Sequence, residues 1–145
     1  MNRQELTQKI KSKMGEIIAE KGYVSAMDLL MRMDLLSQQD YEAWRRRQVP
    51  YLERVIKSNL GRISFIMKTF AGYAGECGLK PSWTAYQSWG KGAKIRLRFS
   101  KSGLEQIERA YATHFILSFK REAVQHFDKE KRLKSEIIMK ELFVY

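Results

Sequence analysis

The chain has 145 residues, of which 44% are hydrophobic and 12% aromatic, a composition that can form a core and is not that of a disordered chain. It contains no apolar run near the ~18 residues of a membrane span and no secretory signal pattern. Because Cys77 is the one cysteine, an internal disulfide is excluded. The 27 basic side chains exceed the 16 acidic ones and give a net charge of +11, which favours an anionic partner. We therefore expect a cytoplasmic protein with one domain, or one domain and an appendage, and no membrane partner.

Positive charge is concentrated in the middle of the chain. Residues 1–43 contain 6 basic and 7 acidic side chains, residues 44–101 contain 13 and 2, and residues 102–145 contain 8 and 7. The middle segment alone therefore has a net charge of +11. Such concentration is typical of a phosphate-binding surface, although lysines and arginines that merely cover a solvated face would also produce it.

The N-terminal third of the chain predicts three helices. Apolar residues at three- and four-residue spacing predict a first helix over 4–21, which is followed by a glycine suited to its C-terminal cap. Ser25 and Ser37 are each followed by an aspartate three residues later. This spacing is typical of helix N-caps and predicts helices over 26–33 and 38–47.

A long central helix is predicted to begin at Tyr51, directly after a proline. Apolar residues follow one another at steps of three or four from Leu52 to Cys77, which indicates an amphipathic helix of about 28 residues. The opposite face of this helix would present basic side chains: Arg54, Lys57, Arg62 and Lys68.

In residues 82–100 the apolar residues recur at every second position, which predicts an antiparallel β-hairpin with glycines in its turn. Apolar and basic residues alternate in its second half: Ile95, Leu97 and Phe99 with Lys94, Arg96 and Arg98. If residue 89 pairs with residue 94, Tyr86 and Ser88 share the inner face with the apolar residues, and Trp83 and Trp89 share the outer face with the cations. A slip of one residue would reverse these faces.

The C-terminal part predicts a short helix over 104–111 and a long charged helix over 115–143. The apolar stripe of the long helix suits an arm that packs on the body or on a second copy, and so predicts a possible homodimer through residues 115–143. The expected fold class is mainly α. A compact helical domain over 1–112 would contain a helix-turn-helix-like unit, the long central helix and the hairpin, and a C-terminal helical arm would cover 113–145.

Residues 25–50 have the dimensions of a helix-turn-helix, because two short capped helices are joined by a three-residue connection. This segment resembles the helix-turn-helix of excisionase-like and winged-helix-type bacterial regulators, in which a serine cap precedes a helix with an aromatic residue and an arginine. Two features depart from that pattern: Asp34 begins the connection where glycine is common, and a long helix separates the hairpin from the second helix. The resemblance implies a regulatory DNA-binding protein of bacterial or phage type.

The candidate nucleic-acid-binding residues come from several segments of the chain. The second helix would present Gln38, Gln39, Glu42 and Arg45 to base edges, since glutamine can pair with adenine and arginine with guanine. Trp83 and Trp89 would stack on unpaired bases, unless they cover the core. The cations expected to contact phosphates are Arg45, Arg46, Arg47, Arg54, Lys57, Arg62, Lys91, Lys94, Arg96 and Arg98. From these residues we expect a nucleic-acid partner, with DNA favoured over RNA.

The sequence contains no recognisable catalytic motif, and we expect neither enzyme activity nor a cofactor nor a metal site. His114 and His126 are isolated in the sequence, and Glu105 and Glu108 have no basic neighbour suited to acid–base chemistry. An alternative function is a protein-interaction or assembly module with a C-terminal dimerisation helix. A third, RNA cleavage by a toxin, would require an acid–base pair that the sequence does not reveal.

Overall fold

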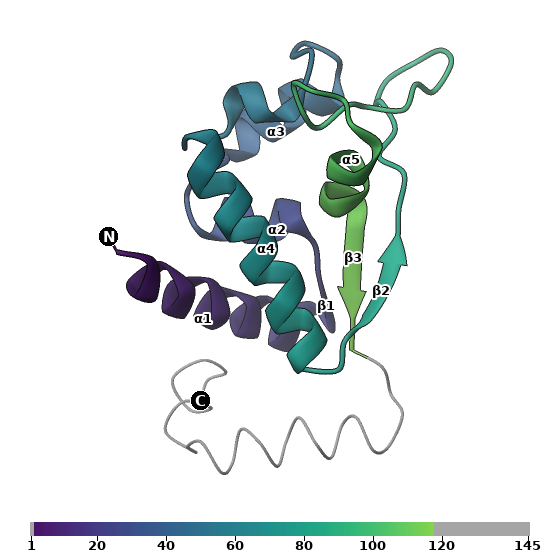
Figure 1. Cartoon of the computed structure of the whole chain (residues 1–145). Coiled ribbons are helices and arrows are strands. Elements are labelled where there is room, and N and C mark those ends of the chain that lie inside the picture. Colours follow the sequence, from purple (N-terminus) through teal and green to yellow (C-terminus); the bar gives the residue numbers. More distant parts are fainter. Residues whose placement is uncertain (1, 118–145) are drawn as a thin grey trace.

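The computed structural model describes residues 2–117, which form a mainly α fold with a small antiparallel sheet (Figure 1). This confirms the predicted fold class. The helices are α1 (Arg3–Lys21), α2 (Ala26–Arg32), α3 (Gln38–Arg45), the 3-10 helix η1 (Leu52–Val55), α4 (Leu60–Glu76) and α5 (Glu105–Ala112). The strands are β1 (Tyr23–Val24), β2 (Lys80–Trp83) and β3 (Thr113–Ile116). Most of the predicted arm and dimer contact, residues 118–143, lies outside the described residues.

The three predicted N-terminal helices are confirmed, including their caps. The hydroxyl oxygens of Ser25 and Ser37 accept hydrogen bonds from the backbone N–H groups of Asp28 and Asp40, at 3.1 and 3.0 Å. Asp34, in the turn between α2 and α3, has a φ of +62°. It therefore takes the left-handed conformation that glycine adopts most readily, at the position where the sequence departs from the helix-turn-helix pattern.

The predicted start of the central helix at Tyr51 is wrong. Residues 52–55 form the short η1, the chain bends over residues 56–58, and α4 begins only after Asn59, whose side chain accepts a hydrogen bond from the N–H of Arg62. The backbone N–H of Leu52 donates instead to the carbonyl oxygen of Arg98, at 3.2 Å. Leu52 and Ile56 are both buried, and so they continue the apolar period without belonging to the helix.

Residues 113–116, which we predicted to lie in the helical arm, form the central strand of the sheet. The strand order is β1-β3-β2, and both pairings of β3 are antiparallel. Phe115 pairs with Val24 on one side and with Pro81 on the other. Proline is tolerated there because β2 is an edge strand. Hydrogen bonding to two strands distant in sequence therefore decides the conformation of this segment.

The hairpin has the predicted register but little regular strand. Gln87 pairs with Arg96. The N–H of Ser88 donates a hydrogen bond to the carbonyl oxygen of Ile95, and the N–H of Leu97 donates one to the carbonyl oxygen of Tyr86, each at 2.8 Å. Tyr86, Leu97 and Phe99 are buried, as expected for the inner face. The predicted burial of Ile95 is wrong, since 40% of this residue is exposed. Ile95 lies next to the glycine-containing turn, where the hairpin extends beyond the body (Figure 1).

The core lies between the helices and the inner face of the hairpin. Trp44 of α3 is fully buried, and its ring centroid lies 5.0 Å from that of Phe99, which in turn stacks on Tyr111 of α5 at 5.4 Å. The buried carboxylate of Glu108 accepts hydrogen bonds from the N–H groups of Phe99 and Ser100, at 2.8 and 2.7 Å. These contacts fix the base of the hairpin against α3 and α5.

Candidate functional site

The second helix of the predicted DNA-binding unit exposes only part of its expected contact face. Gln38 and Gln39 are exposed, and the amide nitrogen of Gln38 donates to a carboxylate oxygen of Glu42 at 3.0 Å. Glu42 and Arg45 are half-buried. Gln38, Arg45 and the neighbouring Tyr41 line a pocket on the side facing the sheet. The face that the sequence assigned to base edges is therefore divided between solvent and this pocket.

The C-terminal end of α3 contacts the hairpin directly. The backbone N–H of Trp89 donates a hydrogen bond to the carbonyl oxygen of Arg45 at 2.7 Å. The guanidinium carbons of Arg45 and Arg46 lie 4.9 and 5.9 Å from the centroid of the Trp89 ring, within cation–π range. Trp89 is 40% exposed, so it does not belong to the core. We call the following residues the Trp89 surface: Arg45, Arg46, Arg47, Trp89, Lys91 and Lys94.

A second tryptophan–arginine pair joins the end of β2, which pairs with β3, to the hairpin. Trp83 is 49% exposed, and the guanidinium carbon of Arg96 lies 5.2 Å from its ring centroid. Arg98, also predicted to contact phosphates, is exposed, and its guanidinium group makes contacts within the chain. The Nε of Arg98 donates a hydrogen bond to the carbonyl oxygen of Ser100 at 2.7 Å, and a second guanidinium nitrogen donates to the carbonyl oxygen of Lys101. The guanidinium group also lies over the ring of Tyr51.

The remaining predicted cations are exposed but lie on other elements. Arg54 is on η1, Lys57 is in the bend after it, and Arg62 is in the first turn of α4. In Figure 1 the N-terminal end of α4 and the tip of the hairpin lie on opposite sides of α3. The start of α4, which carries Arg62, thus lies away from the hairpin tip, whereas the contacts of Arg45 and Arg46 with Trp89 link the end of α3 with the hairpin.

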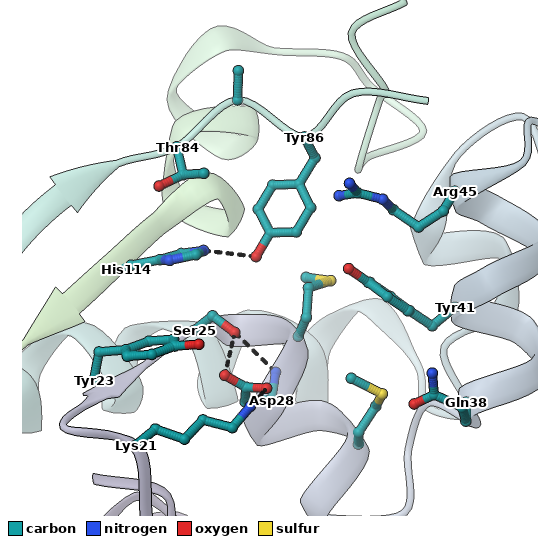
Figure 2. Close-up of a pocket in the computed structure, with 13 residues that line it drawn as sticks. Lys21, Tyr23, Ser25, Asp28, Gln38, Tyr41, Arg45, Thr84, Tyr86 and His114 are labelled. Atoms are coloured by element: carbon teal, nitrogen blue, oxygen red, sulfur yellow. Dashed lines mark hydrogen bonds and ion pairs between the residues drawn. The ribbon is translucent and has the colours of Figure 1, made fainter. Parts of the chain in front are cut away.

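The pocket beside the Trp89 surface has a volume of about 420 Å³. Its wall comes from the end of α1, from β1, α2 and α3, from the segment after β2, and from β3 (Figure 2). Most of its lining side chains are polar or aromatic: Lys21, Tyr23, Ser25, Asp28, Gln38, Tyr41, Arg45, Thr84, Tyr86 and His114. No local pattern in the sequence indicates this pocket, because its walls come from segments far apart in the chain.

His114 and Tyr86 form a hydrogen-bonded pair in the pocket. The Tyr86 hydroxyl lies 2.7 Å from Nε2 of His114, and the ring of Tyr23 stacks on the imidazole with an interplanar angle of 8°. Burial lowers the pKa of His114 and raises the pKa of Tyr86. Both groups are therefore neutral near pH 7, and His114 is not isolated as its sequence context indicated.

Arg45 is the cation of the pocket that has no acidic partner among the described residues. Lys21 forms an ion pair with Asp28 at 2.8 Å, which raises the pKa of Lys21, and the Ser25 hydroxyl donates to the same carboxylate at 2.8 Å. The Nε of Arg45 is buried and has no hydrogen-bond partner. Its guanidinium carbon lies 5.2 Å from the centroid of Tyr86 and 5.9 Å from that of Tyr41. The pocket thus contains one buried donor suited to an anionic ligand.

Neither a metal centre nor a membrane span is present in the described part of the chain. No three side chains among His, Cys, Asp and Glu within residues 2–117 lie close enough to hold a metal ion. None of the described helices is sufficiently long and apolar to cross a membrane. Comparison of the chain with protein-family models, curated protein sequences and solved structures finds no match.

Proposed function

We propose that the protein binds DNA through the Trp89 surface and has a regulatory role. The observation that supports this most directly is the partly exposed Trp89 ring, which lies beside the guanidinium groups of Arg45 and Arg46 where α3 meets the hairpin. An exposed ring can stack on a base, and the surrounding cations can neutralise the phosphates on either side of that base.

The composition of this surface favours unpaired bases over an intact duplex. Stacking on a tryptophan requires a base whose face is free, which single-stranded or locally opened DNA provides. Gln38 and Gln39 are exposed, as base contacts in a major groove require, but Arg45 is engaged with the rings of Trp89 and Tyr86. The proposed interface therefore centres on the end of α3 and the hairpin, not on the first turn of α3.

Fluorescence anisotropy tests this proposal directly. Wild-type protein would be titrated into a labelled single strand of about 20 nucleotides, its duplex, and an RNA of the same sequence, at ~50 and ~200 mM salt. We expect the DNA single strand to bind most tightly and its affinity to fall steeply with salt, with a slope of about −0.7 per phosphate contact. Absence of binding to every probe at ~50 mM salt would overturn the proposal, because even non-specific electrostatic binding is strong there.

Two charge-matched variants show whether binding occurs at the proposed surface. The test variant replaces Arg46, Arg47 and Lys91 with Gln, and the control replaces Lys68, Lys80 and Arg109, which are exposed on α4, β2 and α5. Both variants lose three positive charges. We expect only the test variant to show a flatter salt dependence and an affinity reduced at least tenfold. Equal losses in the two variants would indicate attraction by net charge alone, not a defined surface.

Trp89→Ala separates stacking from charge. Stacking of a base on an aromatic ring is worth about 1–3 kcal/mol, so we expect this variant to bind single-stranded DNA roughly 5- to 150-fold more weakly with an unchanged salt slope. Trp83→Ala shows whether the second exposed tryptophan also contacts the strand. Binding by Trp89→Ala equal to that of the wild type would contradict the role of this ring.

A further inference from the structure

We propose that the pocket behind the Trp89 surface receives one unpaired nucleotide, with its phosphate on Arg45 and its base between the aromatic side chains. This inference rests on the proposed function. Arg45 belongs to both places, since its guanidinium lies 4.9 Å from the Trp89 ring centroid outside the pocket and 5.2 Å from that of Tyr86 inside it. Arg45 is thus the residue at which a strand stacked on Trp89 would meet the pocket.

The size and lining of the pocket fit a nucleotide. Its volume of about 420 Å³ lies within the ~300–1,000 Å³ range of small-ligand sites. Figure 2 shows the rings of Tyr41 and His114 on opposite sides of the space, with the Tyr86 hydroxyl pointing into it. Aromatic walls of this kind accommodate the flat apolar faces of a base. Gln38 also lines the pocket, and because its amide nitrogen donates to Glu42, its amide oxygen is the atom it would offer to a donor on the base edge.

The charges of the pocket specify one anionic group. Lys21 and Asp28 neutralise each other at 2.8 Å, and His114 and Tyr86 are hydrogen-bonded to each other. Arg45 then contributes the one uncompensated positive charge among the charged residues that line the pocket. Its buried Nε lacks a hydrogen-bond partner and would gain one from a phosphate oxygen. A neutral ligand would leave this donor unsatisfied, and a ligand with several phosphates would exceed the available charge.

The experiment uses His114 as a reporter inside the pocket. Its imidazole resonances would be followed by NMR and assigned with His114→Gln, since the chain has two histidines. Four ligands would be titrated separately: a deoxynucleoside 5′-monophosphate, the corresponding nucleoside, inorganic phosphate, and a short single strand that contains 2-aminopurine as a fluorescent base. We expect a saturable shift with the monophosphate, binding at least tenfold weaker for the nucleoside and for phosphate, and a change in 2-aminopurine fluorescence with the strand.

Two arginines provide matched variants. Arg45→Gln removes the pocket cation, whereas Arg109→Gln removes an exposed cation on α5 that lines neither the pocket nor the Trp89 surface. We expect monophosphate affinity to fall at least tenfold in Arg45→Gln and to stay within twofold of wild type in Arg109→Gln. Cooperative thermal unfolding of each variant confirms that it is folded. Arg45→Lys keeps the charge without the bidentate geometry, and we expect it to recover part of the affinity.

The outcomes distinguish this inference from the proposed function. If phosphate or the nucleoside binds as tightly as the monophosphate, the pocket does not recognise a nucleotide and the inference is overturned. If strands bind in a Trp89-dependent way without shifting the His114 resonances or changing the fluorescence of 2-aminopurine, the inference fails and the proposed function stands. If the monophosphate binds but no strand does, the pocket assignment is supported and DNA binding is overturned.

Discussion

The indole N–H of Trp44 donates a hydrogen bond of 2.8 Å to the backbone carbonyl oxygen of Arg98, a residue 54 positions later in the chain. The same carbonyl oxygen accepts a hydrogen bond from the N–H of Leu52 at 3.2 Å. One peptide group thus joins α3, η1 and the hairpin. This junction supports the Trp89 surface, because it holds the base of the hairpin against the helix that presents Arg45 and Arg46.

Trp44→Phe tests the energetic importance of this junction. The replacement keeps an aromatic ring but removes the indole hydrogen bond and leaves part of a fully buried site empty. We expect the free energy of unfolding to fall by about 2 kcal/mol, as measured by urea denaturation. Trp83→Phe is the matched control, since Trp83 is 49% exposed, and we expect a change within about 0.5 kcal/mol. Equal effects at the two positions would contradict the proposed role of the junction.

Features that depend on neighbouring residues could be predicted from the sequence. The serine caps of α2 and α3 require only a hydroxyl three residues before an N–H group, and both are present as expected. The register of the hairpin follows from alternation and from the position of its glycines, which is why Gln87 pairs with Arg96 as predicted. The outward position of Trp89 follows from the same alternation, whereas Trp83, also exposed, belongs to β2 and pairs with Thr113 of β3.

Features that depend on distant partners could not be predicted. Leu52 and Ile56 fit the helical spacing of apolar residues because both are buried. The chain nevertheless forms η1 there, because the backbone N–H groups of Leu52 and Glu53 donate hydrogen bonds to the carbonyl oxygens of residues 98 and 99. Asn59, whose side chain caps α4, is a local signal for the start of this helix that our prediction did not include. The hydrogen bond between Tyr86 and His114 spans 28 residues, and no local pattern in the sequence indicates it.

Glu108→Gln should destabilise the protein although it removes only one charge. The carboxylate of Glu108 is buried and accepts hydrogen bonds from the backbone N–H groups of Phe99 and Ser100 through different oxygens. A glutamine amide would direct its own N–H₂ group at one of these donors. We expect the free energy of unfolding to fall by about 2 kcal/mol, measured by urea denaturation, since hydrogen bonds to charged groups are worth about 1.5–3 kcal/mol.

Glu105→Gln is the control for this effect on the same helix. Glu105 is exposed, and its carboxylate lies 3.9 Å from the guanidinium of Arg96, a surface ion pair of small expected value. We expect a change within about 0.5 kcal/mol. A loss at Glu105 as large as that at Glu108 would contradict the interpretation that the backbone contacts of Glu108 are responsible.

The same replacement, glycine by alanine, should have opposite effects at two positions. Gly22 caps α1 with a φ of +78°, a conformation that costs a residue with a Cβ atom about 1 kcal/mol. Gly72 lies in α4, and a Cβ atom added there would meet no heavy atom within 4 Å. We expect Gly22→Ala to lower the melting temperature and Gly72→Ala to raise it, the latter by stabilising the helix by about 0.5–1 kcal/mol. Changes of the same sign would contradict this backbone argument.

Protonation of His114 should make the stability depend on pH. Burial lowers the pKa of His114 in the folded chain below its ordinary value of 6.5. Between these two values the unfolded chain binds a proton that the folded chain does not. Since stability rises with pH wherever the unfolded state binds more protons, the free energy of unfolding should fall as the pH is lowered from about 7 toward the folded-state pKa, and this contribution should then stay constant.

His114→Gln isolates this contribution, because Gln does not titrate and His126 is present in both proteins. Urea denaturation at several pH values from about 7.5 to 5 would give the difference in the free energy of unfolding between wild type and variant. Gln removes the contact of Nε2 with the Tyr86 hydroxyl, so we expect the variant to be less stable than wild type at pH 7.5. We expect the difference to narrow as the pH falls, because only wild type loses stability through residue 114. A difference that is constant over this range would show that His114 has the same pKa in the folded and unfolded chains.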